Sequence, residues 1–194
     1  MSVAPIINAS EHAWTLHDPR FAIDAEVSVC PNHTPDCEQT GETLIARMLE
    51  YRVDRTVISH VCYYGRNNDY PAHCVQTWPD RFAAIGLLVG HRLFPPQDGE
   101  RNAERLRELV TERGLAGLRL SPIYDRDVRW LDDALCDSLW VAAGDLGVTF
   151  NVFLAPEQLQ QLGVMAERHP AVNVVIDHFA MIDINRPDEE GIDR

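Results

Sequence analysis

Short apolar runs alternate with longer amphipathic segments along almost the whole chain. The apolar runs cover residues 6–12, 56–62, 82–89, 114–120, 148–153 and 173–179, and each has the length of a buried strand. The segments 42–51, 70–78, 101–113, 131–146 and 156–169 place apolar residues at helical spacing. Gly114 and Gly147 end two of these segments, and prolines follow two others. The pattern therefore predicts six strands joined by connections that are long enough for helices.

Connections of this length favour right-handed crossovers and a parallel sheet, which leaves two architectures. An open doubly wound sheet that binds a nucleotide carries a glycine-rich turn after its first strand, but here that turn reads H-A-W-T-L-H-D-P. Five of the six strands instead have a polar residue near the carboxyl end, where barrel enzymes place their chemistry. These residues are His12, His60, Arg119, Asn151 and His178. The sequence thus predicts an α/β fold of the (β/α)8 TIM-barrel type.

A full barrel has eight strands and about 250 residues, whereas this chain of 194 residues supplies six. We therefore expect one barrel domain over residues 1–194, truncated after about six strands and incomplete at the C-terminus. Two readings of such a chain stay open. It is either a truncated, catalytically incompetent fragment or a natural short protein that forms a homo-oligomer to cover its sheet edges.

The composition narrows the class of partner. The net charge is −13, the sequence pI is near 4.9 and 45% of the residues are hydrophobic. Such an acidic chain disfavours nucleic acid and anionic membranes as partners. No apolar run is long enough to span a bilayer and the N-terminus has no signal-like region, so we expect a cytoplasmic protein. The absence of G-x-S-x-G, P-loop and H-E-x-x-H motifs gives serine-hydrolase and phosphoryl-transfer chemistry no support.

The five cysteines are odd in number and include no C-x-x-C pair. We predict free thiols in a reducing compartment. The alternative is a metal site formed by Cys30, Cys37 and His33, although this spacing matches no structural zinc pattern.

The first strand reads I-I-N-A-S-E-H-A-W from residue 6 to residue 14. Side chains alternate between the two faces of a strand, so an inward His12 predicts inward Ser10 and Asn8 and an outward Glu11. Serine is a poor zinc ligand beside imidazole or carboxylate, and only a bulge could turn Glu11 inward. His12 itself is either a functional residue or a strand-end histidine bonded to a neighbour.

Arg119 lies in an apolar strand between Leu118 and Leu120, and a buried charge there must have an acceptor. It is either a fork for a substrate carboxylate or lactone carbonyl, or one half of an internal ion pair. At the end of the sixth strand Asp177 and His178 are adjacent, so only one of them faces the interior. His178 is a candidate general base, with a structural core histidine as the alternative, while Asp177 could orient a ring or pair with a neighbouring strand.

Aromatic and amide side chains gather in the loops that follow the second and fourth strands, where they suit either substrate contact or ordinary loop packing. The candidates for substrate binding are Tyr63, Tyr64, Asn67, Tyr124 and Asn151, with His60 and Tyr70 in the same stretch as the first three.

The stretches I-I-N-A-S-E-H-A-W, G-L-A-G-L-R-L and N-V-V-I-D-H-F together resemble the amidohydrolase-related (amidohydrolase 2) family of predicted metal-dependent hydrolases. Members open with I-[ID]-x-H-x-H-x-W and carry an arginine late in the fourth strand and a histidine late in the sixth. The resemblance implies a distorted (β/α)8 barrel. It also implies a metal, usually zinc, held by first-strand residues, late histidines and an aspartate after the eighth strand.

The resemblance implies catalytic roles for His178, His12 and Arg119, with His12 and His178 also as metal ligands, and it favours His178 as the inward residue of its pair. Ser10 and Asn151 stand where the family has histidines, so a divalent metal is expected to bind weakly or not at all. Members include lactonases and decarboxylases of the aminocarboxymuconate semialdehyde type.

We therefore expect a hydrolase in which activated water opens a lactone or a similar cyclic ester or amide, acting on a small carboxylate or lactone substrate. A decarboxylase is the alternative.

Overall fold

The computed structural model describes residues 4–23, 35–88, 99–124 and 130–182. Six strands form one sheet: β1 (Ile7–Glu11), β2 (Arg55–Ser59), β3 (Phe82–Gly86), β4 (Gly117–Leu120), β5 (Thr149–Val152) and β6 (Asn173–Ile176). The five α-helices are α1 (Gly41–Tyr51), α2 (Asp69–Thr77), α3 (Gly99–Thr111), α4 (Asp137–Leu146) and α5 (Leu159–Arg168). Short 3-10 turns η1 (Pro19–Phe21), η2 (Cys62–Tyr64), η4 (Pro122–Tyr124), η5 (Ala134–Cys136), η6 (Pro156–Gln158) and η7 (Asp177–Met181) lie between them.

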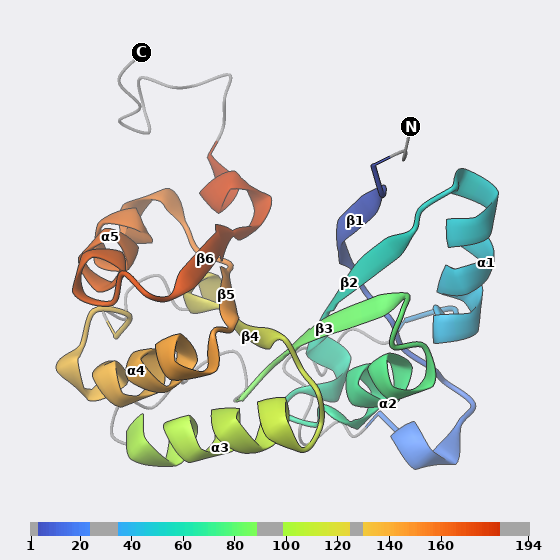
Figure 1. Cartoon of the computed structure of the whole chain (residues 1–194), viewed down its shortest axis with the longest axis horizontal. Helices are drawn as coiled ribbons and strands as arrows, with labels where there is room; N and C mark the ends of the chain where they lie inside the picture. The colour runs from blue at the N-terminus through green and yellow to red at the C-terminus, as the bar shows by residue number, and fades with distance from the viewer. Residues whose placement is uncertain (1–3, 24–34, 89–98, 125–129, 183–194) are drawn as a thin grey trace.

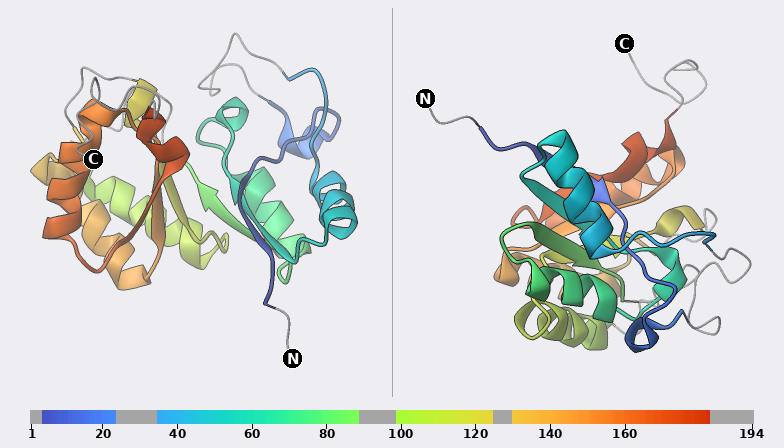
Figure 2. Two further views of the ribbon diagram at one scale, coloured as in Figure 1. Left: turned by 90° about the horizontal axis from the view of Figure 1, so that it is seen from above. Right: turned by 90° about the vertical axis from the view of Figure 1, so that its right-hand side faces the viewer.

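The strand order decides between the two expected architectures. The strands follow one another as β1-β2-β3-β4-β5-β6, and every neighbouring pair is parallel. A doubly wound sheet reverses its order at a switch point, whereas a barrel adds strands in sequence. The sheet curls, with its helices on the outside and its edge strands β1 and β6 facing one another across the open side (Figures 1 and 2). The predicted TIM-barrel type of fold is confirmed as a curled part-barrel of six strands.

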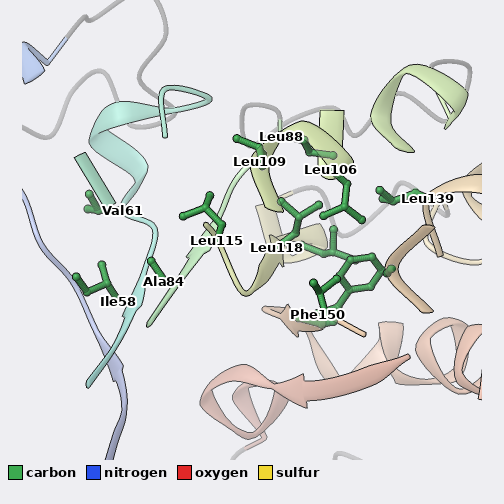
Figure 3. Close-up of a cluster of buried hydrophobic side chains, with 14 of the residues drawn as sticks. Ile58, Val61, Ala84, Leu88, Leu106, Leu109, Leu115, Leu118, Leu139 and Phe150 are labelled. Carbon is green, nitrogen blue, oxygen red and sulfur yellow. The ribbon is translucent and has the colours of Figure 1, made fainter. Parts of the chain in front are cut away.

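The core lies between the convex face of the sheet and the helices, as Figure 3 shows around β4 and β5. Leu118 and Phe150 are fully buried there, against Leu106 of α3 and Trp140 of α4, and the Trp140 and Phe150 rings meet edge to face at 5.0 Å. Because neighbouring residues of a strand point to opposite faces, the strand partners Arg119 and Asn151 face the concave side.

Gly117 permits the close pairing of β4 and β5. A Cβ atom at this position would lie 1.8 Å from the carbonyl oxygen of Thr149 on the neighbouring strand. No side chain fits in that space, so the glycine is required for the register that places Arg119 beside Asn151.

The predicted helices and strands are all present, but two element boundaries and the state of one cysteine differ from the prediction. Strand β6 stops at Ile176, because the backbone from His178 to Met181 has positive φ angles of 49° to 57°. The helix predicted from residue 131 begins only at Asp137, after η5. Cys62 is disulfide-bonded, so the prediction of free thiols is wrong for that residue, since no local spacing signals the bond.

Cys37, Cys74 and Cys136 are free, as predicted. The metal site considered at Cys30 and His33 falls outside the described residues. Within the described ranges, none of the helices has the length and apolar character needed to cross a membrane.

Candidate active site

A buried ion pair between Arg119 and Asp177 lies at the carboxyl end of the sheet. Arg119 Nη2 donates to Asp177 Oδ2 at 2.6 Å, and the two side chains are only 10% and 8% exposed. Arg119 Nη1 donates to the carbonyl of His60 at 3.5 Å, and the guanidinium carbon lies 5.1 Å from the centre of the Phe153 ring. The internal ion pair considered for Arg119 is therefore formed.

Asp177, and not His178 as expected, faces the interior of the part-barrel. Asn151 pairs with Val175 across the sheet, and Asp177 lies two residues beyond Val175, so it continues on the concave face. His178 begins the stretch of positive φ and its side chain is 55% exposed, with Nε2 at 3.7 Å from Asp177 Oδ1. The prediction that His178 faces the interior is wrong, because the chain turns at that residue and leaves the histidine at the rim.

Several polar atoms at this end of the sheet have no hydrogen-bond partner among the described residues. They are Ser59 Oγ, His60 Nδ1, Arg119 Nε and Asn151 Oδ1, and each is buried. Buried polar atoms are nearly always hydrogen-bonded. A group of unpaired ones therefore marks a place where a ligand or water supplies the missing hydrogen bonds. Arg119 and Asn151 are strand partners, which places two of these atoms on neighbouring side chains.

Two consecutive carbonyls at the end of β2 bind the side chains that flank it. His12 Nδ1 lies 2.8 Å from the carbonyl oxygen of Ser59, and Arg119 bonds to that of His60. A carbonyl oxygen only accepts, so Nδ1 of His12 carries the hydrogen and, in the neutral ring, Nε2 is left as an acceptor. An imidazole held in this tautomer can serve as a general base.

His60 is anchored in the interior. Its Nε2 donates to the carbonyl of Gly65 at 2.7 Å, and the side chain is 2% exposed. Burial lowers the pKa of His60 to about 4, the Gly65 bond opposes this, and the nearby charges of Arg119 and His12 lower it further. His60 is therefore neutral near pH 7 and holds the loop after β2 in place.

The first strand contains a register irregularity that changes its faces. Asn8 pairs with Thr56 and Glu11 pairs with Ile58, so the irregularity lies between Asn8 and Glu11. Both side chains line a hollow against α1, and Asn8 Nδ2 donates to Glu11 Oε2 at 3.5 Å. The predicted outward Glu11 is confirmed, but the predicted inward Asn8 is wrong, because the extra residue reverses its parity. Ser10 lies inside the irregularity and is exposed.

The residues after β2 do not join the site. Tyr64 is 1% exposed, and its hydroxyl accepts from Thr15 N–H at 3.0 Å and donates to Thr15 O at 3.3 Å. Tyr63 is 9% exposed and its ring packs edge-on against Trp14. Asn67 Oδ1 accepts from the N–H of Asp69 at the start of α2. For these residues the structure favours packing and capping over the predicted substrate contact.

Tyr124 does join the site, through a residue that the sequence analysis missed. Phe153 follows Asn151 by two residues and packs against three neighbours: the Arg119 guanidinium, the Tyr124 ring at 5.9 Å and the His178 ring at 5.0 Å. The signal in the sequence was its strand parity with Asn151. Phe153 thus forms an apolar wall between the buried pair and the exposed rim.

The side chains present do not fit a metal centre built from several protein ligands. Among the described residues, no three His, Cys, Asp or Glu side chains converge so as to hold an ion. His12 and Asp177 are both engaged, and Ser10 and Asn151 are weak ligands for transition metals. The chemistry considered below therefore relies on the protein side chains.

The family model described as Amidohydrolase matches residues 23–193. The chain belongs to this amidohydrolase family. The resemblance seen in the sequence is thereby confirmed, although the match begins after β1 and its altered histidine motif. No curated protein matches the chain.

Solved structures share the fold at low identity. A probable 2-pyrone-4,6-dicarboxylic acid hydrolase from Acinetobacter baumannii, with citric acid bound, is 22% identical with a TM-score of 0.75, over 97% of this chain and 65% of that one. A 2,6-dihydroxybenzoate decarboxylase from Rhizobium is 16% identical with a TM-score of 0.66, over 92% and 67%.

A 5-carboxyvanillate decarboxylase from Novosphingobium aromaticivorans, complexed with manganese, is 17% identical with a TM-score of 0.59, over 91% and 65%. This chain thus spans about two thirds of the length of these structures. The neighbours include both hydrolases and decarboxylases, so the fold does not choose between the two reactions.

Proposed function

We propose that this amidohydrolase-family chain opens a lactone, or a similar cyclic ester, by attack of water on the ring carbonyl. The proposal rests on the hydrogen bonds that the Arg119 guanidinium makes in the structure. Nη2 binds Asp177 and Nη1 binds the His60 carbonyl, so Nε is the guanidinium nitrogen that has no partner among the described residues. The Nε–H group can donate to the carbonyl oxygen of a substrate. Because Asp177 already neutralises this guanidinium, a neutral ring is favoured over a free carboxylate as substrate, and ring hydrolysis over decarboxylation.

The described residues support the following sequence of steps. The carbonyl oxygen of the substrate accepts from Arg119 Nε–H and from the Nδ2–H group of Asn151, which stabilise the negative charge that develops on it. His12 Nε2 accepts a proton as water attacks the carbonyl carbon. The bond between that carbon and the ring oxygen then breaks, and the same proton passes to the ring oxygen. The product is an open-chain hydroxy acid.

Asp177 acts in this scheme as the positioning group for Arg119. Its carboxylate neutralises the guanidinium in a buried place, so the site as a whole does not attract an anion by charge. A neutral lactone ring therefore fits the pair better than a free carboxylate does. Weak or absent metal binding, the cytoplasmic location and the homo-oligomer stay predictions.

Product analysis separates the two reactions. The 194-residue chain is incubated with carboxylated and uncarboxylated lactones in water enriched in heavy oxygen, and in parallel with aromatic carboxylates. We expect acid release with one heavy oxygen in the new carboxyl group, and no carbon dioxide. Release of carbon dioxide without ring opening would support the decarboxylase, and no turnover of any lactone would overturn the proposal.

A further inference from the structure

A second hollow, which the proposed reaction does not use, lies between the β2–α2 loop and α3. Its volume is about 590 Å³, and three arginines line it: Arg66 from the loop, and Arg101 and Arg105 from α3. Leu88 and Asn102 are its most buried lining residues, at 8% and 6% exposed. We call this set of residues the arginine cleft. Helices α2 and α3 lie side by side in Figures 1 and 2.

Two of the three guanidinium groups have no ion-pair partner within the described part of the chain. Arg105 pairs with Glu108 at 2.7 Å, but Arg66 and Arg101 make no ion pair or side-chain hydrogen bond with any described residue. Among the described lining residues, three arginines stand against two acidic side chains, Glu104 and Glu108. In a chain with a net charge of −13, a lining with excess positive charge is a local exception.

The base of the cleft offers a further donor. Asn102 is buried, and its Nδ2 has no hydrogen-bond partner among the described residues. Buried amide donors are seldom left unpaired, so this group is an independent sign that a ligand oxygen or a water belongs there.

The loop that carries Arg66 is fixed to the sheet. Asn68 donates to the carbonyls of Arg66 and Leu87 at 2.9 and 2.7 Å, and accepts from Leu87 N–H at 2.8 Å. Gly86 leaves room for this, since a Cβ atom there would lie 2.5 Å from Asn68 Oδ1. A loop held in this way places the Arg66 side chain opposite α3 without a large entropy cost on binding.

We propose that the arginine cleft binds a small oxyanion that carries at least two negative charges. Guanidinium groups recognise carboxylate and phosphate oxygens by charge-assisted hydrogen bonds. The volume lies in the range of small-molecule pockets. The acidic chain and the two lining glutamates oppose long polyanions such as nucleic acid. The site does not depend on the proposed lactone hydrolysis.

Titration calorimetry at low salt tests the site, with inorganic phosphate and citrate as separate probes to distinguish a phosphate ligand from a polycarboxylate. The variant is Arg66→Gln with Arg101→Gln. The control is Arg107→Gln, which removes one exposed charge from the same helix outside the cleft. We expect the double variant to bind the preferred probe about tenfold more weakly or worse, and the control to bind as the wild type does.

Asn102→Leu is a second variant, which removes the buried donor without changing any charge. We expect it to weaken binding severalfold while its urea midpoint stays close to that of the wild type. The proposal is overturned if the wild type binds neither probe. It is also overturned if the Arg107→Gln control loses as much affinity as the double variant, because bulk charge alone would then explain the binding.

Discussion

The buried His60 gives the fold a specific sensitivity to acid. Its pKa falls from the ordinary 6.5 to about 4 because the ring is fully buried. At a pH between these two pKa values, His60 is protonated in the unfolded chain but stays neutral in the folded chain. Stability from this residue is therefore fully present above about pH 6.5 and is lost as the pH falls toward 4. The loss reaches about 2 kcal/mol at pH 5 and about 3 kcal/mol below both values.

Urea denaturation at pH 7.5 and pH 5.0 measures this loss, and His60→Gln isolates it from the titration of carboxylates. The glutamine keeps an N–H that can reach the Gly65 carbonyl, but it does not titrate. We expect the wild type to lose about 2 kcal/mol more than the variant over this range. The exposed His17→Gln control should keep the wild-type dependence. If His60→Gln loses as much stability as the wild type, our account of His60 is refuted.

Three further predictions concern packing and the buried pair. Arg119→Leu and Asp177→Leu should each lower the free energy of unfolding by about 3–5 kcal/mol, and the double variant by much less than the sum, in a urea double-mutant cycle; additive losses would argue against the pair. Gly117→Ala should unfold at clearly lower urea because its Cβ meets a carbonyl at 1.8 Å, whereas Gly163→Ala, with open space around it, should gain about 0.5–1 kcal/mol; equal effects would contradict this. A thiol reagent should label Cys37 well before the two buried free thiols, whose pKa burial raises to about 12; equal labelling rates in the folded state would count against it.

The barrel-type fold could be predicted because its signals are local. Apolar runs, helical spacing and glycine stops each depend on neighbouring residues, and Arg119 and Asn151 could be recognised as polar residues near the ends of two apolar runs. Both lie near the carboxyl ends of their strands, as predicted.

The misplaced residues depended on backbone irregularities that alternation cannot reveal. The extra residue in β1 reversed Asn8, and the turn after β6 moved His178 out and left Asp177 inside. Tyr64 was misjudged because a loop aromatic can reach the core, and only the tertiary structure shows its hydroxyl bonded to Thr15.

The central claim is that the Nδ2–H group of Asn151 and the Nε–H group of Arg119 donate to the substrate carbonyl. The most direct measurement is kcat/KM for lactone hydrolysis by Asn151→Leu, compared with Thr149→Val on the same face of β5 at its other end. We predict that Asn151→Leu lowers kcat/KM about 100-fold with little change in urea stability, and that Thr149→Val leaves kcat/KM unchanged. Equal kcat/KM values for Asn151→Leu and the wild type would contradict the account.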